Sequence, residues 1–191
     1  MKTVEETTED LIRFKTVEGN AQELENCLNY IEEQLDSGLD FQRFEKNGEK
    51  SVLISRGENP RILLHGHLDV VEAEDEMFEP EVENGRMYGR GAADMKSGVA
   101  CMMKVLEEVE NEGVALLLTS DEERGGFKGT GYVLDEADLD PEFVISGEPD
   151  DSESFPSIVA KQKGVLQLEI STDGKSAHSS KPEKGENAAE K

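Results

Sequence analysis

Four residues of the sequence have side chains that suit a metal centre: His67, Asp94, Glu123 and Glu148. His67, Glu123 and Glu148 each follow a short apolar run, and such runs are typical of strands buried on both faces. Asp94 precedes apolar residues at helical spacing. Because open α/β sheets bind ligands outside the carboxyl ends of their strands, we expect the four side chains to meet in one crevice.

The donor types indicate which metal this crevice would bind. One imidazole and three carboxylates favour zinc, or a similar first-row divalent metal, over calcium. Three carboxylates around a single zinc ion would be unusual, so a carboxylate that bridges two metals accounts better for the set. Asp69 follows His67 by two residues and would share its face in an extended segment. We expect Asp69 to orient the His67 ring through its other nitrogen.

The pair Glu122-Glu123 admits two interpretations. In an extended backbone the two side chains point to opposite sides, so that one binds metal while the other faces the substrate and transfers protons. Other Glu-Glu pairs of this acidic chain, such as Glu32-Glu33, are expected on solvated helix faces, and Glu122-Glu123 could be one more. Its position directly after the apolar run 115–118 favours metal chemistry, but the pattern alone leaves both interpretations open.

The elements that must position these residues follow from periodicity and turn signals. Thr3 and Glu6 form a capping-box pattern at the start of a first helix, and Asn20 can cap a second one. Asn47-Gly48 and Asn84-Gly85 predict tight turns. We expect a hairpin from 41–44 and 51–55, strands at 61–68, 114–118 and 143–146, a helix headed by Asp94 and a short helix at 132–134. This alternation predicts an α/β fold with a mixed, mostly parallel sheet covered by helices on both faces.

Composition excludes several classes of protein. The 191 residues include 44 acidic and 20 basic side chains, a net charge of -24, which argues against nucleic acid or an anionic membrane as a partner. Cys27 and Cys101 form no C-x-x-C pair and are expected in the core of a reduced protein. The chain shows no apolar leader and no apolar run near the roughly 18 residues of a membrane span, so we expect a soluble, cytoplasmic protein.

Five motifs, in order along the chain, resemble those of a family of zinc peptidases and deacylases. This family includes acetylornithine deacetylase, succinyl-diaminopimelate desuccinylase, aminoacylase and glutamate carboxypeptidase. The motifs are GHLDVV at 66–71, GRGAADMKSG at 89–98, DEE at 121–123, GEP at 147–149 and GKSAHSSKPEKGENA at 174–188. The resemblance implies a di-zinc aminopeptidase-like catalytic domain, with its N-terminal part at 1–162 and the beginning of an α+β lid and dimerisation domain at 163–191.

The resemblance also implies a role for each site residue. Asp94 would bridge two zinc ions, for which cobalt or manganese could substitute, and the peptide after Asp94 would be cis. Glu122 would be the general acid/base for a water activated by the two metals. The remaining members would act as follows: His67 as a ligand of one metal, Asp69 behind His67, and Glu123 and Glu148 as ligands of one metal each.

The positions of three further residues in the sequence also suggest a role for each. His178 lies in a motif similar to that of the lid domain, which implies contact with substrate, often across a dimer interface; without the motif it would be an exposed loop histidine. His65 is expected to be structural. Lys96 is expected to be a structural ion-pair partner near the acidic site.

The family pattern requires one more histidine ligand, from a segment that follows the lid domain. The three histidines of this chain are His65, His67 and His178, and none of them fits that place. We therefore expect the sequence to be part of a longer protein, a homodimer when complete, and expect this part alone to have little or no activity.

The function these residues favour is hydrolysis of an amide bond in a small N-acyl amino acid or short peptide. Removal of an acyl or succinyl group from an N-acyl amino acid is the preferred interpretation. Carboxypeptidase or dipeptidase action remains an alternative, as does a metal-binding protein without catalysis. The presence of both Asp69 and Glu122 argues against the last alternative, since a purely structural site needs neither.

Overall fold

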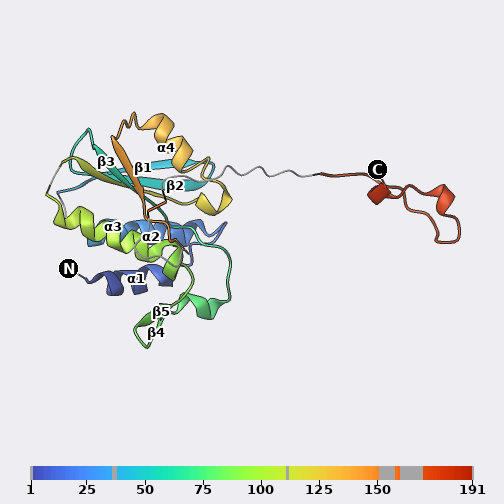
Figure 1. Cartoon of the computed structure of the whole chain (residues 1–191), viewed down its shortest axis with the longest axis horizontal. Helices are drawn as coiled ribbons and strands as arrows, with labels where there is room; N and C mark the ends of the chain where they lie inside the picture. The colour runs from blue at the N-terminus through green and yellow to red at the C-terminus, as the bar shows by residue number, and fades with distance from the viewer. Residues whose placement is uncertain (1, 36–37, 111, 151–157, 160–169, 191) are drawn as a thin grey trace. The chain divides into compact units, whose positions relative to one another are not determined.

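The computed structural model describes residues 2–35, 38–110, 112–150, 158–159 and 170–190 (Figure 1). The chain divides into two compact units, Met1–Asp151 and Ser152–Lys191. The two units are considered separately below. The domain boundary predicted at residue 162 lies outside the described residues.

A five-stranded sheet forms the centre of the first unit. Its strands lie side by side in the order β1-β2-β6-β3-β7, with β1 and β2 antiparallel, β2 and β6 antiparallel, and both β6–β3 and β3–β7 parallel. The prediction of a mixed sheet is therefore confirmed. The strands are β1 (Asp40–Lys46), β2 (Glu49–Ser55), β3 (Ile62–His67), β6 (Val114–Thr119) and β7 (Phe143–Ser146).

The parallel strands bring three chain segments to one edge of the sheet. His67 at the end of β3 is paired with Thr119 at the end of β6, and His65 is paired with Ser146 at the end of β7. The residues that follow β6 and β7 therefore emerge beside His67. This register is what places Glu122 and Glu148 near the histidine.

Helices cover both faces of the sheet, as predicted. The helices α1, α2 and α3 lie on one side and α4 lies on the other (Figure 1). Thr3 and Glu6 make both hydrogen bonds of the predicted capping box, and the Asn20 side chain accepts from Glu23 N. The helices are α1 (Val4–Arg13), α2 (Ala21–Gln34), α3 (Ser97–Glu108) and α4 (Thr130–Glu136), and short 3-10 turns occur at Asp75–Phe78 and Glu122–Arg124.

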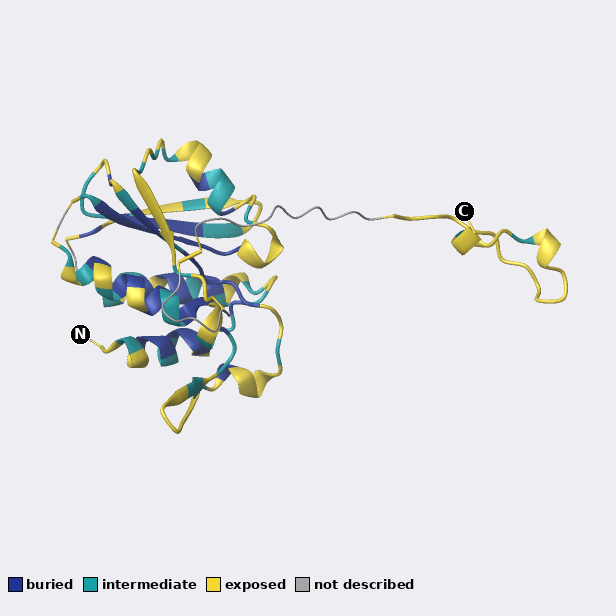
Figure 2. Cartoon of the chain, in the orientation of Figure 1, coloured by how far each residue is buried: buried dark blue, intermediate teal, exposed yellow. Residues whose placement is uncertain are grey.

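The hydrophobic core is centred on β6, whose six residues are all buried (Figure 2). Its side chains alternate between the two faces, so Leu116 and Leu118 pack toward the three-helix side while Ala115 and Leu117 pack toward α4. The edge strand β7 is different, since Phe143 remains 63% exposed. The expectation that both cysteines are core residues is wrong for Cys101, which is exposed on α3, whereas Cys27 is buried.

Both predicted tight turns are present. Asn47 and Gly48 join β1 to β2 with φ angles of 53° and 87°. Asn84 and Gly85 join β4 (Glu81–Glu83) to β5 (Arg86–Tyr88) with φ angles of 52° and 74°. Two successive positive φ angles match the right-handed twist of the flanking strands, and Asn-Gly is the pair that adopts them most readily.

The second unit is described only in part. Residues 158–159 and 170–172 lie in no strand or helix. The segment 174–187 contains a β-bridge between Lys175 and Glu186 and a short 3-10 helix, Pro182–Lys184. Among the described residues of the chain, no helix combines the length and apolarity needed to cross a bilayer.

We predict that Leu116→Ala lowers the free energy of unfolding by about 2–5 kcal/mol, because it opens a cavity in the fully buried central strand. Leu116 is 0% exposed. The matched control is Val82→Ala on β4, where the side chain is 61% exposed. Urea denaturation of both variants checks the prediction, and an equal loss of stability in the two would contradict this placement of the core.

Candidate metal centre

His67 is the central residue of the site. Its side chain is fully buried at the end of β3. Nδ1 lies 2.8 Å from the main-chain carbonyl oxygen of Asp69, and because a carbonyl can only accept, Nδ1 carries the hydrogen. In the neutral imidazole this hydrogen bond leaves the lone pair of Nε2 free to bind a cation.

Three carboxylates surround Nε2 of His67. It lies 3.0 Å from Asp94 Oδ1, 3.7 Å from Glu148 Oε1 and 3.8 Å from Glu122 Oε2. One ligand atom each from His67, Glu122 and Glu148 lies within 4.8 Å of the others. These residues come from the ends of β3, β6 and β7. The predicted convergence at the carboxyl edge of the sheet therefore holds for His67 and Glu148, whereas the third member of this group is Glu122 and not the predicted ligand Glu123.

Asp94 reaches the site from an irregular turn. It lies in the π-helical turn Ala92–Lys96, with φ and ψ of -119° and 100°, so the regular helix headed by this residue in the sequence interpretation begins only at Ser97. The peptide bond between Asp94 and Met95 is cis, as the resemblance implied. The turn directs Asp94 to the histidine instead of continuing the line of α3.

Asp69 connects the histidine to the Glu122-Glu123 pair. Its buried carboxylate accepts hydrogen bonds from the backbone nitrogens of Glu122, at 3.2 Å to Oδ1, and Glu123, at 3.0 Å to Oδ2. The predicted contact with the His67 ring is present, but the main-chain carbonyl of Asp69 makes it at 2.8 Å while the carboxylate lies 3.4 Å away. The side chain therefore holds the acidic turn in addition to lying behind the histidine.

The Glu122-Glu123 pair does not lie in extended backbone, so the geometry assumed for it in the sequence interpretation is wrong. Glu122 begins the 3-10 turn Glu122–Arg124, in which successive side chains still diverge. Glu122 faces His67 and Glu148. Glu123 instead lines a neighbouring cavity of about 440 Å³ together with Asp69 and Arg124. The pair thus separates as expected, by a different backbone geometry.

Burial and repulsion among the carboxylates both shift the pKa values of the site residues. Burial raises the pKa of Glu148, the charge of His67 opposes this shift, and the charges of Asp94 and Glu122 add to it. Burial and then the charge of Asp94 raise the pKa of Glu123. Burial alone would lower the pKa of His67, but Asp69 and Glu148 together raise it to about 9. A divalent cation would offset this repulsion, and the imidazole and carboxylate donors fit zinc or a similar ion.

Asp121 is a structural contributor for which the sequence interpretation gave no role. Its carboxylate is buried and accepts from the backbone nitrogens of Lys128, at 2.7 Å, and Gly129, at 2.9 Å. A Cβ atom on Gly129 would lie 2.2 Å from Asp121 Oδ1, so this loop needs glycine there. The available signal was an aspartate ahead of a glycine-rich segment, which is typical of a side chain that caps its own loop.

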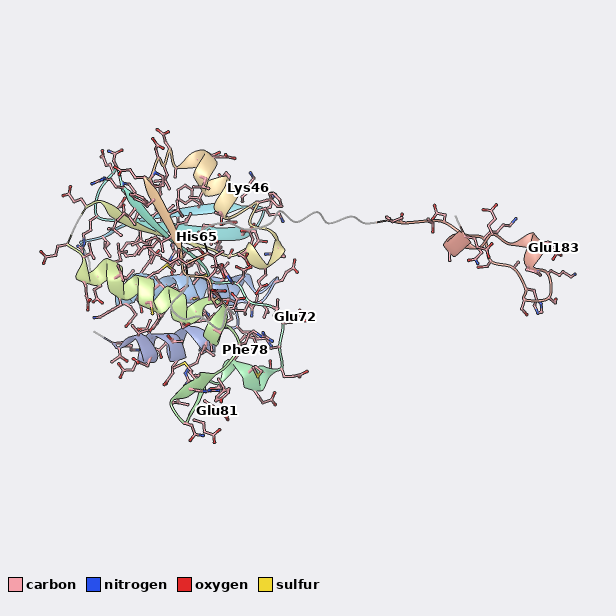
Figure 3. All side chains as sticks on the ribbon, viewed as in Figure 1. Lys46, His65, Glu72, Phe78, Glu81 and Glu183 are labelled. Atoms are coloured by element: carbon pink, nitrogen blue, oxygen red, sulfur yellow. The ribbon has the colours of Figure 1, made fainter. Side chains whose placement is uncertain are left out.

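The remaining candidates take other positions. His65 Nε2 lies 3.0 Å from Thr130 Oγ1 of α4, and His65 lies within the sheet layer (Figure 3), which agrees with a structural role. Lys96 is buried, and its Nζ donates to a carbonyl oxygen, that of Phe14, rather than to the expected carboxylate. In the second unit, Nδ1 of the exposed His178 accepts from the Ser180 backbone nitrogen at 3.2 Å, and its substrate role stays a prediction.

We predict that binding of cobalt at pH 7 releases about one proton, because His67 must lose its proton before Nε2 can bind the ion. With a His67 pKa of about 9, the apparent affinity should rise with pH below that value and level off above it. Calorimetric titration in two buffers of different ionisation enthalpy measures the release. His65→Asn is the control, since burial and then the charge of His67 lower the pKa of His65. Identical heats in the two buffers would contradict the assignment.

Two known proteins are similar to the chain in sequence. The chain is 36% identical over 178 residues to a succinyl-diaminopimelate desuccinylase of a Nitratiruptor species, a match that covers 86% of this chain and 48% of that protein. A second succinyl-diaminopimelate desuccinylase, from a Sulfurovum species, is 33% identical over 95% of this chain and 52% of its own length. The chain therefore spans about half the length of these relatives.

The fold of the chain is also similar to that of proteins with solved structures. An M20 family metallo-carboxypeptidase from Sulfolobus solfataricus superposes with a TM-score of 0.62 at 20% identity, over 77% of this chain and 37% of that one. At this identity the likeness shows the fold alone. The profile of Peptidase family M20/M25/M40 matches residues 63–185, a range that includes His67, Asp94, Glu122 and Glu148. The chain belongs to Peptidase family M20/M25/M40.

Proposed function

We propose that the protein is a metal-dependent hydrolase that removes an acyl group, with succinyl as the first candidate, from an N-acyl amino acid. The observation that carries the proposal is the convergence of Asp94, Glu122 and Glu148 on Nε2 of the buried His67. The choice of a deacylase over a carboxypeptidase or dipeptidase is supported by the two desuccinylases at 36% and 33% identity.

Two zinc ions are the proposed cofactors, with cobalt or manganese as substitutes. His67 and Asp94, whose nearest atoms are 3.0 Å apart, would hold one side of the centre. Asp94 would bridge the ions, and Glu123 and Glu148 would bind one ion each. When bound, the ions would supply Lewis acidity, which lowers the pKa of water and polarises an amide carbonyl.

Glu122 is the proposed general acid/base. Its side chain is 46% exposed, so it is accessible from solvent, yet it lies 3.8 Å from His67 Nε2. A carboxylate in this position can take a proton from the attacking water and return it to the leaving amine. Asp69 keeps Glu122 in place through the backbone hydrogen bond at 3.2 Å.

The acidic surroundings limit where an N-acyl amino acid can bind. Among the described residues that line the cavity beside Glu123, the cation is Arg124, which is paired with Glu18 at 3.0 Å and Glu49 at 2.7 Å. The carboxylate of a substrate therefore needs other cationic partners. His178 is proposed as one substrate contact. We also propose that the protein forms a cytoplasmic homodimer, in which His178 of one subunit could reach the substrate of the other.

The test of the substrate class is a panel of N-succinyl and N-acetyl amino acids and dipeptides. The panel is assayed on the protein as its host expresses it, with zinc or cobalt added. Preferred cleavage of the N-acyl compounds is the expected result. Cleavage of dipeptides alone would replace the deacylase proposal with the dipeptidase alternative, and turnover of none, with metal bound, would favour a non-catalytic member.

We predict that Glu122→Gln lowers kcat by about 10²–10⁴-fold, since glutamine cannot take up or return the proton. The metal content should stay unchanged, because the proposed ligands remain. Steady-state kinetics and elemental analysis of the same preparation measure both quantities. Glu33→Gln, on the exposed face of α2, is the matched control. Turnover that survived Glu122→Gln would show that another group transfers the proton.

A further inference from the structure

Lys96 occupies a position that packing alone does not explain. Its side chain is 0% exposed, and the partner found for Nζ among the described residues is the Phe14 carbonyl oxygen, at 2.7 Å. Removal of an ammonium from water is unfavourable even after the protein relaxes, whereas methionine would fill a similar volume without this penalty. The ammonium must therefore contribute something that an apolar side chain cannot.

The acceptor of this hydrogen bond lies at the end of α1. Phe14 is the residue that follows the last turn of the helix, where carbonyl groups carry partial negative charge that favours a cation. The same carbonyl oxygen also accepts from the backbone nitrogen of Thr16, at 2.9 Å. Lys96 thus fixes the start of a short segment, residues 14–16, which we call the connector.

The connector also holds both peptide groups that flank Asp69. The hydroxyl of the buried Thr16 donates to the carbonyl oxygen of Leu68, and the carbonyl oxygen of Thr16 accepts from Val70 N at 3.2 Å. Two hydrogen bonds therefore hold the chain on either side of Asp69, the residue that orients His67 and the Glu122-Glu123 turn.

Packing around the lysine stem joins the turn that carries Asp94 to the segment after Asp69. A Cβ atom on Gly91, at the start of the Asp94 turn, would lie 3.0 Å from Lys96 Cδ and 2.9 Å from Val70 Cγ1. The turn that carries Asp94, the stem of Lys96 and the segment after Asp69 are therefore in close contact. A shift of any one of them has to move the others.

We propose that Lys96 is a positioning residue: its ammonium, through the connector, fixes the turn that carries Asp94 relative to the segment that carries His67 and Asp69. Lys96 does not touch the reacting atoms in this role. The effect on metal affinity rests on the proposed metal centre, whereas the effect on the connector does not.

The test compares Lys96→Met with the unchanged protein in two measurements. Removal of the donor should speed amide hydrogen exchange at Val70, Glu122 and Glu123 in the metal-free protein. The reason is that the connector would hold the peptide groups on either side of Asp69 less firmly. It should also weaken cobalt binding by about 10–100-fold, the range found when partners of metal ligands are lost. Exchange is followed residue by residue, and cobalt binding by calorimetry and visible absorption.

Three further variants separate positioning from general stability. Thr16→Val removes the hydroxyl without disturbing Lys96 and should reproduce both effects, while Thr16→Ser should retain nearly unchanged behaviour. Leu106→Ala, at a fully buried position on α3 outside the connector, should lower the stability without raising exchange at these three amides. If Lys96→Met fails to fold, the comparison of Thr16→Val with Thr16→Ser decides.

The outcomes are distinguishable. Unchanged exchange and unchanged cobalt affinity in folded Lys96→Met and Thr16→Val would overturn the proposal, and so would the same exchange pattern in Leu106→Ala. If the unchanged protein binds no cobalt, the proposed function fails, and amide exchange alone still decides whether Lys96 acts through the connector.

Discussion

The site depends on the buried carboxylate of Asp69, which accepts hydrogen bonds from two successive backbone nitrogens. These belong to Glu122 and Glu123 and lie 3.2 and 3.0 Å from its oxygens. A charged acceptor makes such bonds stronger than those between neutral groups, and the buried setting makes them costly to break. Because the main-chain carbonyl of Asp69 also accepts a hydrogen bond from Nδ1 of His67, one residue fixes both the histidine ring and the acidic turn.

This arrangement explains how the fold tolerates a site in which like charges oppose each other. The parallel register of β3, β6 and β7 delivers His67, Glu122 and Glu148 to the same edge, and the irregular turn before α3 adds Asp94. Without a bound metal the carboxylates of this cluster repel one another, and this repulsion adds to burial in raising the pKa of Glu148. Backbone hydrogen bonds to Asp69 and Asp121 hold the loop after β6 against that repulsion. The sheet sets the positions, and buried aspartates maintain them.

Much of the frame could be predicted because its signals are local. The capping box of Thr3 and Glu6, the Asn-Gly turns and the apolar run of β6 each specify structure through neighbouring residues, and each prediction is confirmed. The convergence of His67 and Glu148 also followed, since parallel strands share a carboxyl edge.

The features that were not predicted correctly from the sequence depend mainly on contacts between distant segments of the chain. The 3-10 geometry at Glu122 arises from hydrogen bonds to Asp69, which lies 53 residues earlier in the chain. The acceptor of Lys96 is a carbonyl 82 residues away, so no local pattern could indicate it. Cys101 fits a helical apolar pattern, yet the face it occupies on α3 is exposed. Apolar periodicity indicates that a segment is helical, but it does not show which residues at the edge of the apolar stripe are buried by other elements.

The most direct test of the account is the cobalt affinity of Asp69→Asn. The substitution leaves the main-chain carbonyl that holds His67 in place, but it replaces one acceptor oxygen with an amide group that faces a backbone N–H. Release of the Glu122-Glu123 turn should then weaken cobalt binding by about 10–100-fold and alter the visible spectrum of the bound ion. An affinity and spectrum equal to those of the unchanged protein would contradict the claim that Asp69 assembles the centre.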